Sequence, residues 1–376
     1  MKQLLYIAPV IIDFEKLNGV SKKILNQYKV FIKSYNVTLI SYGPDCLYYL
    51  NNNFFETIPL GNANRRLKMY SFIDKTLSVN SYNFIYTRYH LCDFLFLNSL
   101  RILSKKKSKI VIEIPTFPYK HELLKWKGGA MRYFMDASSN FLLRLYVGRI
   151  VTYSNDHKIF GIKTINTING IIYENVTPVQ KKPYNANEIH LISVSLTMSC
   201  HGYDRLIEGL KEYYQLGGDI NIIYHLVGEG DEIKRYKELV IKYGIEKHVI
   251  FYGFKTGSEL DALYEKAELA VNSIAIHRIG LQTESTIKSK EYAAKGLPMI
   301  SSYAVDAFSS QDNEKYVHQI SPDETPVDID GLIEFYKKMY QNSDRNISEE
   351  IRSASQKRCD MSVTLRGVVE YFNAAV

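Results

Sequence analysis

The chain has 376 residues, enough for two domains of ordinary size, and its 46% hydrophobic and 23% charged content is that of a soluble globular protein. No apolar run approaches the length of a membrane span, and the apolar amino terminus leads into Asp13 and Glu15 where a signal peptide would have a cleavage site. The four cysteines are far apart and form no CxxC pair, which gives no sign of a zinc site or a disulfide framework and suits a reducing cytoplasm.

The net charge of +7 is distributed unevenly along the chain. Residues 1–180 hold 24 Lys or Arg against 11 Asp or Glu, whereas the rest holds 23 against 29. A basic half can bind nucleic acid or an anionic membrane, at roughly 1 kcal/mol for each well-placed cation near a charged surface. The alternative is that these cations only keep the domain soluble.

The first elements are a strand, a glycine turn and a helix. The apolar run Leu4–Ile12 predicts a buried strand, and the pattern from Lys22 to Ser34 predicts a helix with Ser21 as its N-cap. Gly19 allows a tight turn between the two, and the backbone amides at such a helix start can hold an anion. The ordinary alternative is a simple turn.

Three further strands are predicted in the first half, over Val37–Tyr42, Phe84–Tyr89 and Lys109–Ile114, with a helix over 91–103. The third strand ends at Glu113 and continues into a loop that contains two prolines and Tyr119. A carboxylate at the end of a buried strand is seldom accidental, so we expect Glu113 or Tyr119 to contact a substrate. Alternatively, Glu113 only accepts hydrogen bonds from neighbouring backbone.

Residues 123–147 mix aromatic and aliphatic side chains with five Lys or Arg if Arg149 just beyond is included. Basic and aromatic residues on helices are typical of a membrane surface. A helix packed on its own sheet gives nearly the same pattern, and both interpretations stay open. Strands over 148–154 and 164–168 follow, and Pro178, Pro183 and a lysine pair then predict a linker.

The second half alternates strands and helices, which predicts a parallel, doubly wound sheet. The last such unit has an apolar run over 269–276, a polar turn, and a one-sided helix over Ile287–Lys295 that is closed by Gly296. Lys288 and Glu291 are three residues apart and share a helix face at the carboxyl end of the strands, where open α/β sheets bind ligands. A cation and a carboxylate there suit a substrate with phosphate and sugar hydroxyls, although such pairs are more often solvated surface pairs.

The segment SKEYAAKGLPMIS resembles the signature helix of the GT-B glycosyltransferases, in the retaining set called glycosyl transferases group 1, or family 4. Many members read P-x-K-x-x-E-Y-x-A-x-G-x-P, and the matching residues here are Lys288, Glu291, Tyr292, Ala294, Gly296 and Pro298, with Thr286 in place of the first proline. The resemblance implies an α/β GT-B fold, with two facing Rossmann-like doubly wound domains and a cleft between them. We therefore expect a first domain over 1–178, a linker over 179–187, a second domain over 188–358, and a terminal helix over 359–376 that returns to the first domain.

The resemblance also implies the donor, a nucleotide-diphosphate sugar carrying UDP or GDP, and no bound metal or other cofactor. Lys288 and Glu291 would bind it, and Gly253-Phe254 matches the base-binding turn of the family. The loop before Gly202 carries an Arg and a Lys in the family, and this chain has Leu196 and His201 there. One cation is therefore lost and the other is titratable, so that helix amides and Lys288 are expected to hold the diphosphate.

The family often has E-x(7)-E ending at the position of Glu291, and counting back gives Thr283, one residue before Glu284. Either the loop shifts and Glu284 contacts the sugar, or that role is absent; we favour the shift. The candidate catalytic carboxylates are thus Glu284 and Glu113. On the acceptor side the resemblance points to Asn18 and Gly19, together with Tyr119.

The resemblance implies a hexosyltransferase-like enzyme that is retaining and metal-independent, and the reduced cysteines suit the cytoplasm. By resemblance to bacterial enzymes of capsule, O-antigen or exopolysaccharide synthesis, its acceptor would be a lipid-linked saccharide, reached at the inner face of the plasma membrane. The basic first half would contact the anionic membrane, and nucleic acid is not an expected partner. Two alternatives remain: a GT-B sugar-nucleotide epimerase, which needs catalytic carboxylates in both domains, and a non-enzymatic basic protein that binds nucleic acid.

Overall fold

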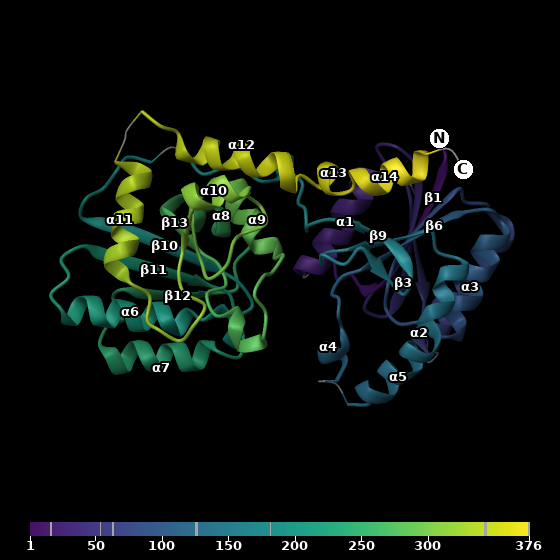
Figure 1. The fold of residues 1–376 in the computed structure, drawn as a ribbon, viewed down its shortest axis with the longest axis horizontal. Coiled ribbons are helices and arrows are strands. Elements are labelled where there is room, and N and C mark those ends of the chain that lie inside the picture. Colours follow the sequence, from purple (N-terminus) through teal and green to yellow (C-terminus); the bar gives the residue numbers. More distant parts are fainter. Residues whose placement is uncertain are drawn as a thin grey trace. The chain divides into compact units, whose positions relative to one another are not determined.

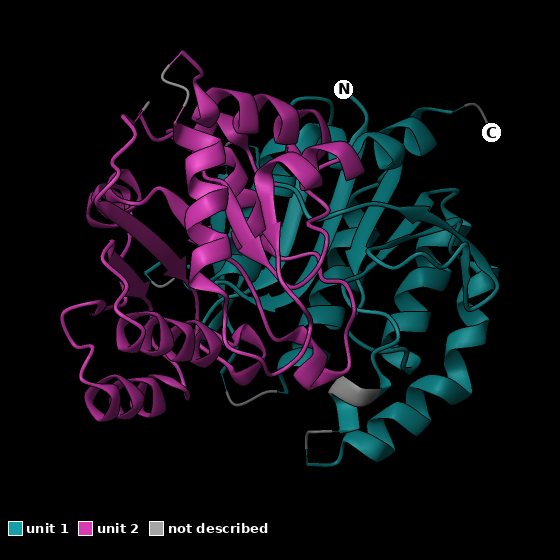
Figure 2. Cartoon of the chain, turned by 60° about the vertical axis from the view of Figure 1, so that its left-hand side comes forward, with its two compact units in different colours: residues 1–170, 361–376 teal, residues 171–360 magenta. Residues whose placement is uncertain are grey.

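The computed structural model describes residues 1–374 except 16, 53, 62–63, 125–126, 181 and 342–343. The chain forms two compact units, coloured separately in Figure 2: unit 1 comprises Met1–Gly170 and Met361–Val376, and unit 2 comprises Ile171–Asp360. Unit 1 holds 25 Lys or Arg against 11 Asp or Glu, and unit 2 holds 22 against 29. The charge asymmetry of the sequence is therefore a difference between two separately folded units.

Unit 1 is built on a nine-stranded sheet in the order β4-β3-β2-β1-β5-β6-β7-β9-β8 (Figure 1). Its strands are β1 (Gln3–Ile11), β2 (Asn36–Tyr42), β3 (Cys46–Asn51), β4 (Phe54–Pro59), β5 (Phe84–Arg88), β6 (Lys109–Ile114), β7 (Arg149–Thr152), β8 (Lys158–Ile159) and β9 (Ile162–Asn166). The six neighbouring strands β2, β1, β5, β6, β7 and β9 pair in parallel, as predicted. At the two edges of the sheet, β3, β4 and β8 pair antiparallel. The hairpin β3–β4 was not foreseen, because no alternating pattern was recognised between the second and third predicted strands.

The helices of unit 1 are α1 (Gly19–Phe31), α2 (Arg65–Val79), α3 (Phe94–Lys105), α4 (Lys120–Leu124), α5 (Gly129–Ser139), the 3-10 helix η1 (Asn140–Leu145), α13 (Met361–Thr364) and α14 (Arg366–Asn373). The helix α1 begins three residues earlier than predicted, because Asn18 is its N-cap: the Asn18 side chain accepts a 2.9 Å hydrogen bond from the Ser21 amide. Ser21 is itself buried and donates to the Ile11 carbonyl oxygen at 3.4 Å. The prediction of Ser21 as N-cap is therefore wrong.

Unit 2 is built on a six-stranded sheet in the order β12-β11-β10-β13-β14-β15, and all of its pairs are parallel. The strands are β10 (Glu188–Val194), β11 (Asn221–Val227), β12 (Val249–Gly253), β13 (Leu269–Val271), β14 (Met299–Ser301) and β15 (Val317–Gln319). The helices are η2 (Tyr173–Asn175), η3 (Ser199–His201), α6 (Tyr203–Gln215), α7 (Ile233–Tyr243), α8 (Gly257–Lys266), η4 (Ile276–Ile279), α9 (Ile287–Lys295), α10 (Ser310–Tyr316), α11 (Ile329–Tyr340) and α12 (Ile347–Cys359).

The helix α9 has the bounds that the sequence predicts, and its ends explain why. At the start, the Thr286 hydroxyl accepts from the Ser289 amide at 3.3 Å. At the end, Gly296 adopts a φ of +81°, and a Cβ there would lie 2.2 Å from the Ser348 hydroxyl oxygen, so only glycine fits. The predicted strand before it is shorter than expected, because β13 ends at Val271 and the buried chain continues into η4.

Among the helices that the structure describes, none combines the length and apolar character that crossing a bilayer requires.

Candidate functional site

The first part of the candidate site is the amino end of α6, at the carboxyl edge of the second sheet. Gly202 precedes this helix with a φ of +68°, and a Cβ on it would lie 2.5 Å from the Ala275 Cβ. Gly202 is the N-cap residue of α6 and, being glycine, provides no side-chain cap. The first-turn amides of this 13-residue helix are therefore positioned to receive an anion, with the helix dipole in support.

Lys288 brings a cation to the same place. Its Nζ lies 3.5 Å from the hydroxyl of Tyr203, the first residue of α6, and 5.7 Å from the centre of that ring. Burial lowers the pKa of Lys288 to about 8, although the nearby Glu284 charge acts in the opposite direction. The ammonium thus remains largely protonated at neutral pH, and it is poorly hydrated, which strengthens its attraction for an anion.

His201 is a neutral residue in this structure. The ring is buried, stacks on Tyr203 with centroids 5.5 Å apart, and accepts a 3.1 Å hydrogen bond from the Met198 amide at Nδ1. Burial, followed by the charge of Lys288, lowers its pKa to about 3. The expectation that His201 is a titratable cation is therefore wrong; with Nδ1 accepting, its Nε2 carries the proton and is a neutral donor.

Glu284 is held by a chain of buried hydrogen bonds. The Tyr303 hydroxyl donates to Glu284 Oε2 at 3.3 Å and accepts from Asn272 Nδ2 at 3.0 Å, and both supporting side chains are buried. The next loop residue, Ser285, accepts from Lys290 Nζ at 3.2 Å. Hydrogen bonds from Tyr303 and Lys290 thus hold two successive residues of this loop. The Glu284 carboxylate lies close enough to Lys288 for its charge to raise the pKa of Lys288. That geometry is compatible with the one-residue shift predicted for the family motif.

Glu291 and the turn after β12 complete the donor-side candidates. Glu291 lies one helical turn after Lys288 on α9, partly buried. Gly253 has a φ of +65°, its carbonyl oxygen accepts from the Gly228 amide at 2.8 Å, and the Phe254 side chain after it is exposed. These residues lie at the carboxyl ends of their strands, at the same sheet edge as α6.

An ion-pair network around the buried Asp204, which the sequence did not reveal, fixes the start of α6. Asp204, in the first turn, accepts from both terminal nitrogens of Arg278 at 2.9 Å and from Arg235 at 2.9 Å. Arg278 also pairs with Glu324. Because these partners come from η4, α7 and the loop before α11, the network joins four separate segments, and no local sequence signal links them.

In unit 1, the structure gives Glu113 a structural role. The carboxylate is fully buried and forms 2.9 Å ion pairs with Lys23 Nζ and Arg88, besides accepting from Tyr86 at 2.6 Å and Gln27 at 2.7 Å. Burial alone would raise the pKa of Glu113, but the two cations and these hydrogen bonds lower it to about 2. Its oxygens are occupied and closed to solvent, so the catalytic assignment of Glu113 is corrected.

The other acceptor-side candidates are near the same sheet edge. Asn18 and Gly19 are exposed at the start of α1, where the Asn18 side chain caps the helix. Tyr119 is half-buried, and its hydroxyl donates to the buried carboxylate of Asp136 on α5. Asp136 also accepts from Tyr89 at 2.5 Å. The structure therefore shows Tyr119 holding α5, and contact with an acceptor stays a prediction.

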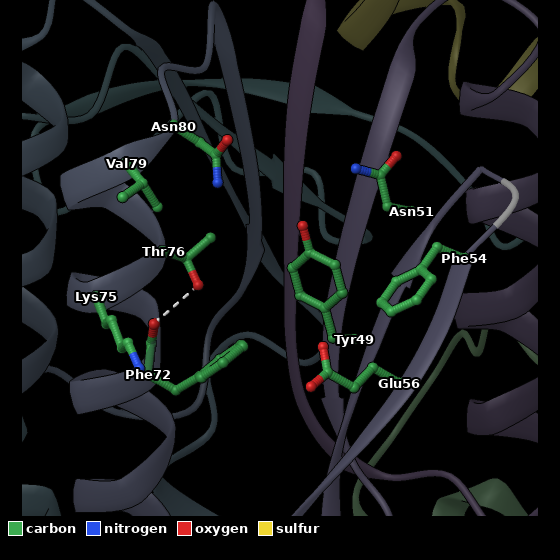
Figure 3. A pocket seen from close by; sticks show the side chains of 9 residues that line it. All are labelled: Tyr49, Asn51, Phe54, Glu56, Phe72, Lys75, Thr76, Val79 and Asn80. Carbon is green, nitrogen blue, oxygen red and sulfur yellow. Dashed lines mark hydrogen bonds between the residues drawn. The ribbon is translucent and has the colours of Figure 1, made fainter.

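Unit 1 also has an open groove of about 450 Å³ between α2 and the hairpin β3–β4 (Figure 3). Tyr49 packs edge-on against Phe72 across it, with ring centres 5.9 Å apart. Asn51 at its rim pairs with Thr38 near the amino end of β2. The groove thus lies toward the amino edge of the sheet, away from the edge where Rossmann-like sheets bind ligands.

Comparison with known proteins identifies the second unit most clearly. Residues 178–304 match the family model described as "Glycosyl transferases group 1", a range that includes every donor-side candidate named above. Comparison with curated protein sequences finds no significant match.

Several solved structures share the whole fold. HepE of Anabaena in complex with UDP superposes with a TM-score of 0.64 at 13% identity, covering 100% of both chains. Sucrose-phosphate synthase from Thermosynechococcus elongatus gives 0.63 at 13% identity and covers 100% of both chains, and the lipopolysaccharide outer core galactosyltransferase WaaB gives 0.57 at 12% identity and covers 98% of both. The chain therefore has the two-domain GT-B fold, and the family match in unit 2 supports a glycosyltransferase.

Proposed function

We propose that the protein is a glycosyltransferase whose second unit binds a nucleotide-diphosphate sugar. The observation that carries the proposal is the approach of Lys288 to the first residue of α6: its Nζ lies 3.5 Å from the Tyr203 hydroxyl. An ammonium that is largely removed from water, close to the first residue of a helix, suits a diphosphate. This constellation lies inside the stretch that matches the group 1 family.

In this proposal the diphosphate is the leaving group, and Lys288 with the amides of α6 stabilises the charge that develops on it. His201 adds a neutral hydrogen bond from Nε2. Glu291 accepts hydrogen bonds from ribose hydroxyls, and Glu284 contacts the transferred sugar, held in place by Tyr303. Lys288 and the amides supply the positive charge, so the proposed reaction uses no metal.

The finer parts of the proposal concern the donor base, the acceptor and the stereochemistry. Neighbouring HepE structures hold UDP, UDP with glucose, or UDP-glucose, which favours UDP over GDP here. We infer a retaining transfer to a lipid-linked saccharide in surface polysaccharide synthesis, at the cytoplasmic face of an anionic membrane. The excess of cations in unit 1 supports the membrane part.

A thermal-shift panel of UDP, GDP, ADP, CMP and their common sugars tests the donor assignment. We expect one nucleotide diphosphate and its sugars to raise the melting temperature selectively, because a ligand that binds only the folded state stabilises it. No shift with any of them would contradict the donor site. If the bound nucleotide sugar is then converted to an epimer without acceptor, the protein is an epimerase instead.

The donor affinity should depend on pH through Lys288. Its pKa lies near 8 in the free protein, so the ammonium is lost as the pH rises above that value, and a bound diphosphate raises the pKa by favouring the charged form. We therefore expect the Kd for the nucleoside diphosphate, measured by calorimetry, to rise from pH 8 upward. Lys288→Arg keeps its charge and should remove this alkaline loss. A flat profile for the wild type up to pH 9 would contradict the role of Lys288.

A further inference from the structure

The helix α5 of unit 1 buries an aspartate and exposes its three large apolar residues other than Tyr133. The side that faces the unit carries Gly129, Tyr133 and Asp136, of which the first and last are buried. Met131, Phe134 and Met135 lie on the opposite side of the helix, given its period of 3.6 residues. A surface helix ordinarily turns its apolar stripe toward the core, so this helix is reversed.

The reversal is maintained by specific contacts. Asp136 accepts hydrogen bonds from the Tyr89 hydroxyl at 2.5 Å and the Cys92 amide at 2.7 Å, and also from Tyr119. The Ser139 hydroxyl donates to the Cys92 carbonyl oxygen at 3.0 Å. These polar contacts fix the rotation of α5 about its axis, and this rotation directs Met131, Phe134 and Met135 outward.

The next segment, η1, also exposes large apolar residues, as α5 does. The exposed fractions are 67% for Met131, 74% for Phe134, 52% for Met135, 47% for Phe141 and 62% for Leu145. Single exposed apolar residues are normal on a protein, but a group at helical spacing marks an interaction site. We call these five residues the α5 surface.

Exposed cations occur in the same stretch of the chain as the α5 surface. Lys120, Lys127, Arg132 and Arg144 are all exposed, whereas Asp136, the one acidic residue of α5 and η1, is buried. Apolar side chains flanked by cations match the boundary of a bilayer that contains anionic lipids: the apolar groups enter the acyl region and the cations remain at the headgroups. A protein partner would need an acidic rim around an apolar centre.

We propose that the α5 surface docks unit 1 on an anionic membrane by inserting Met131, Phe134 and Met135 into it. This inference gives the membrane contact of the proposed function a location and a mode of binding. It rests on the proposed function in one respect: a lipid-linked acceptor would explain why the enzyme binds a membrane. It adopts the membrane interpretation of residues 123–147, of which Lys125 and Trp126 lie outside the described residues.

The test is co-sedimentation of the full-length protein with vesicles of phosphatidylcholine, with and without phosphatidylglycerol, at low and high salt. We expect binding that needs phosphatidylglycerol and is only partly removed by salt, because insertion persists when charges are screened. Met131→Gln, Phe134→Gln and Met135→Gln together keep the charge and the helix propensity, and should weaken binding by about tenfold or more. Arg132→Gln with Arg144→Gln should weaken binding at low salt only.

The matched control is Val79→Gln, Leu216→Gln and Ile241→Gln, which replaces three equally exposed apolar residues elsewhere and should bind vesicles like the wild type. Vesicle binding by the α5 triple variant equal to that of the wild type would overturn the proposal. The proposal would also be overturned if light scattering without lipid showed that the wild type is a dimer and the α5 triple variant is a monomer. The nucleotide thermal shift, run in parallel, separates this outcome from failure of the donor site, since the variants should keep that shift unchanged.

Discussion

Replacing Lys288 with alanine is expected to lower kcat/KM for the nucleotide sugar by about 10²–10³-fold, the range found when one preorganised donor to a developing negative charge is removed. The side chain is the cation at the amino end of α6, with Nζ 3.5 Å from Tyr203, and His201 beside it is neutral. Arg278 and Arg235, the described cations that contact the start of α6, are paired with Asp204, so we do not expect them to replace the lost charge. Steady-state kinetics with the donor identified by the thermal-shift panel measures the effect.

Two controls make the Lys288 result specific. Lys266→Ala removes an exposed lysine of α8 in the same unit and should leave turnover unchanged. Circular dichroism should show that Lys288→Ala is folded, because among the described residues Lys288 forms no ion pair and makes one long hydrogen bond, to Tyr203. Wild-type turnover in Lys288→Ala would show that the diphosphate is held elsewhere.

Glu113→Ala should destabilise unit 1 by about 3–5 kcal/mol, because removing one partner of a buried pair leaves uncompensated charge. In the wild type, Lys23 and Arg88 each lie 2.9 Å from the Glu113 carboxylate. In the variant, both cations would remain at the buried site without that partner. Hydrogen exchange of unit 1 peptides measures this loss separately from unit 2, which is necessary because a two-unit chain need not unfold in one step. Lys23→Met in the same chain should recover part of the loss, by removing one of the stranded cations.

The pH dependence of this stabilisation has a definite sign. The pKa of Glu113 is lowered from 4.5 to about 2 in the folded protein, so its contribution is complete above pH 4.5 and is lost as the pH falls through 2. The difference between the wild type and Glu113→Ala should therefore shrink in acid. If instead Glu113→Gln abolished turnover without changing hydrogen exchange, the carboxylate would be catalytic and its structural assignment would be wrong.

The sequence predicted the regular parts of the fold because they depend on local signals. The apolar runs at β6 and β1 and the capped helix α9 each carry their own pattern, and α9 was located to the residue. The hairpin β3–β4 was missed because its second strand, Phe54–Pro59, is mostly exposed and lacks alternation. The bounds of α1 were misplaced because Asn18 and Ser21 are both good N-caps, and only the fold decides between them.

The candidate site was predictable where one segment carries it. Lys288, Glu291 and Gly202 became candidates through the resemblance to a family motif, and the structure places Lys288 Nζ 3.5 Å from the hydroxyl of Tyr203, the residue after Gly202. The protonation of His201 could not be predicted, because it depends on burial by distant segments. The same holds for Tyr303, whose contact with Glu284 joins two loops, and for the arginines that bind Asp204.

Unit 1 is discontinuous in sequence, since its first 170 residues are joined by residues 361–376 after the whole of unit 2. The late segment is part of the packing: Phe372 stacks on Phe84 with ring centres 4.7 Å apart and also contacts Tyr35, 6.2 Å away. A ribosome that adds roughly 5–20 residues per second needs about 10–40 s to make unit 2, and for that time unit 1 lacks these contacts. The unit that leaves the ribosome first is thus completed last, and in the interval Phe84 and Tyr35 are an exposed apolar surface for chaperones to cover.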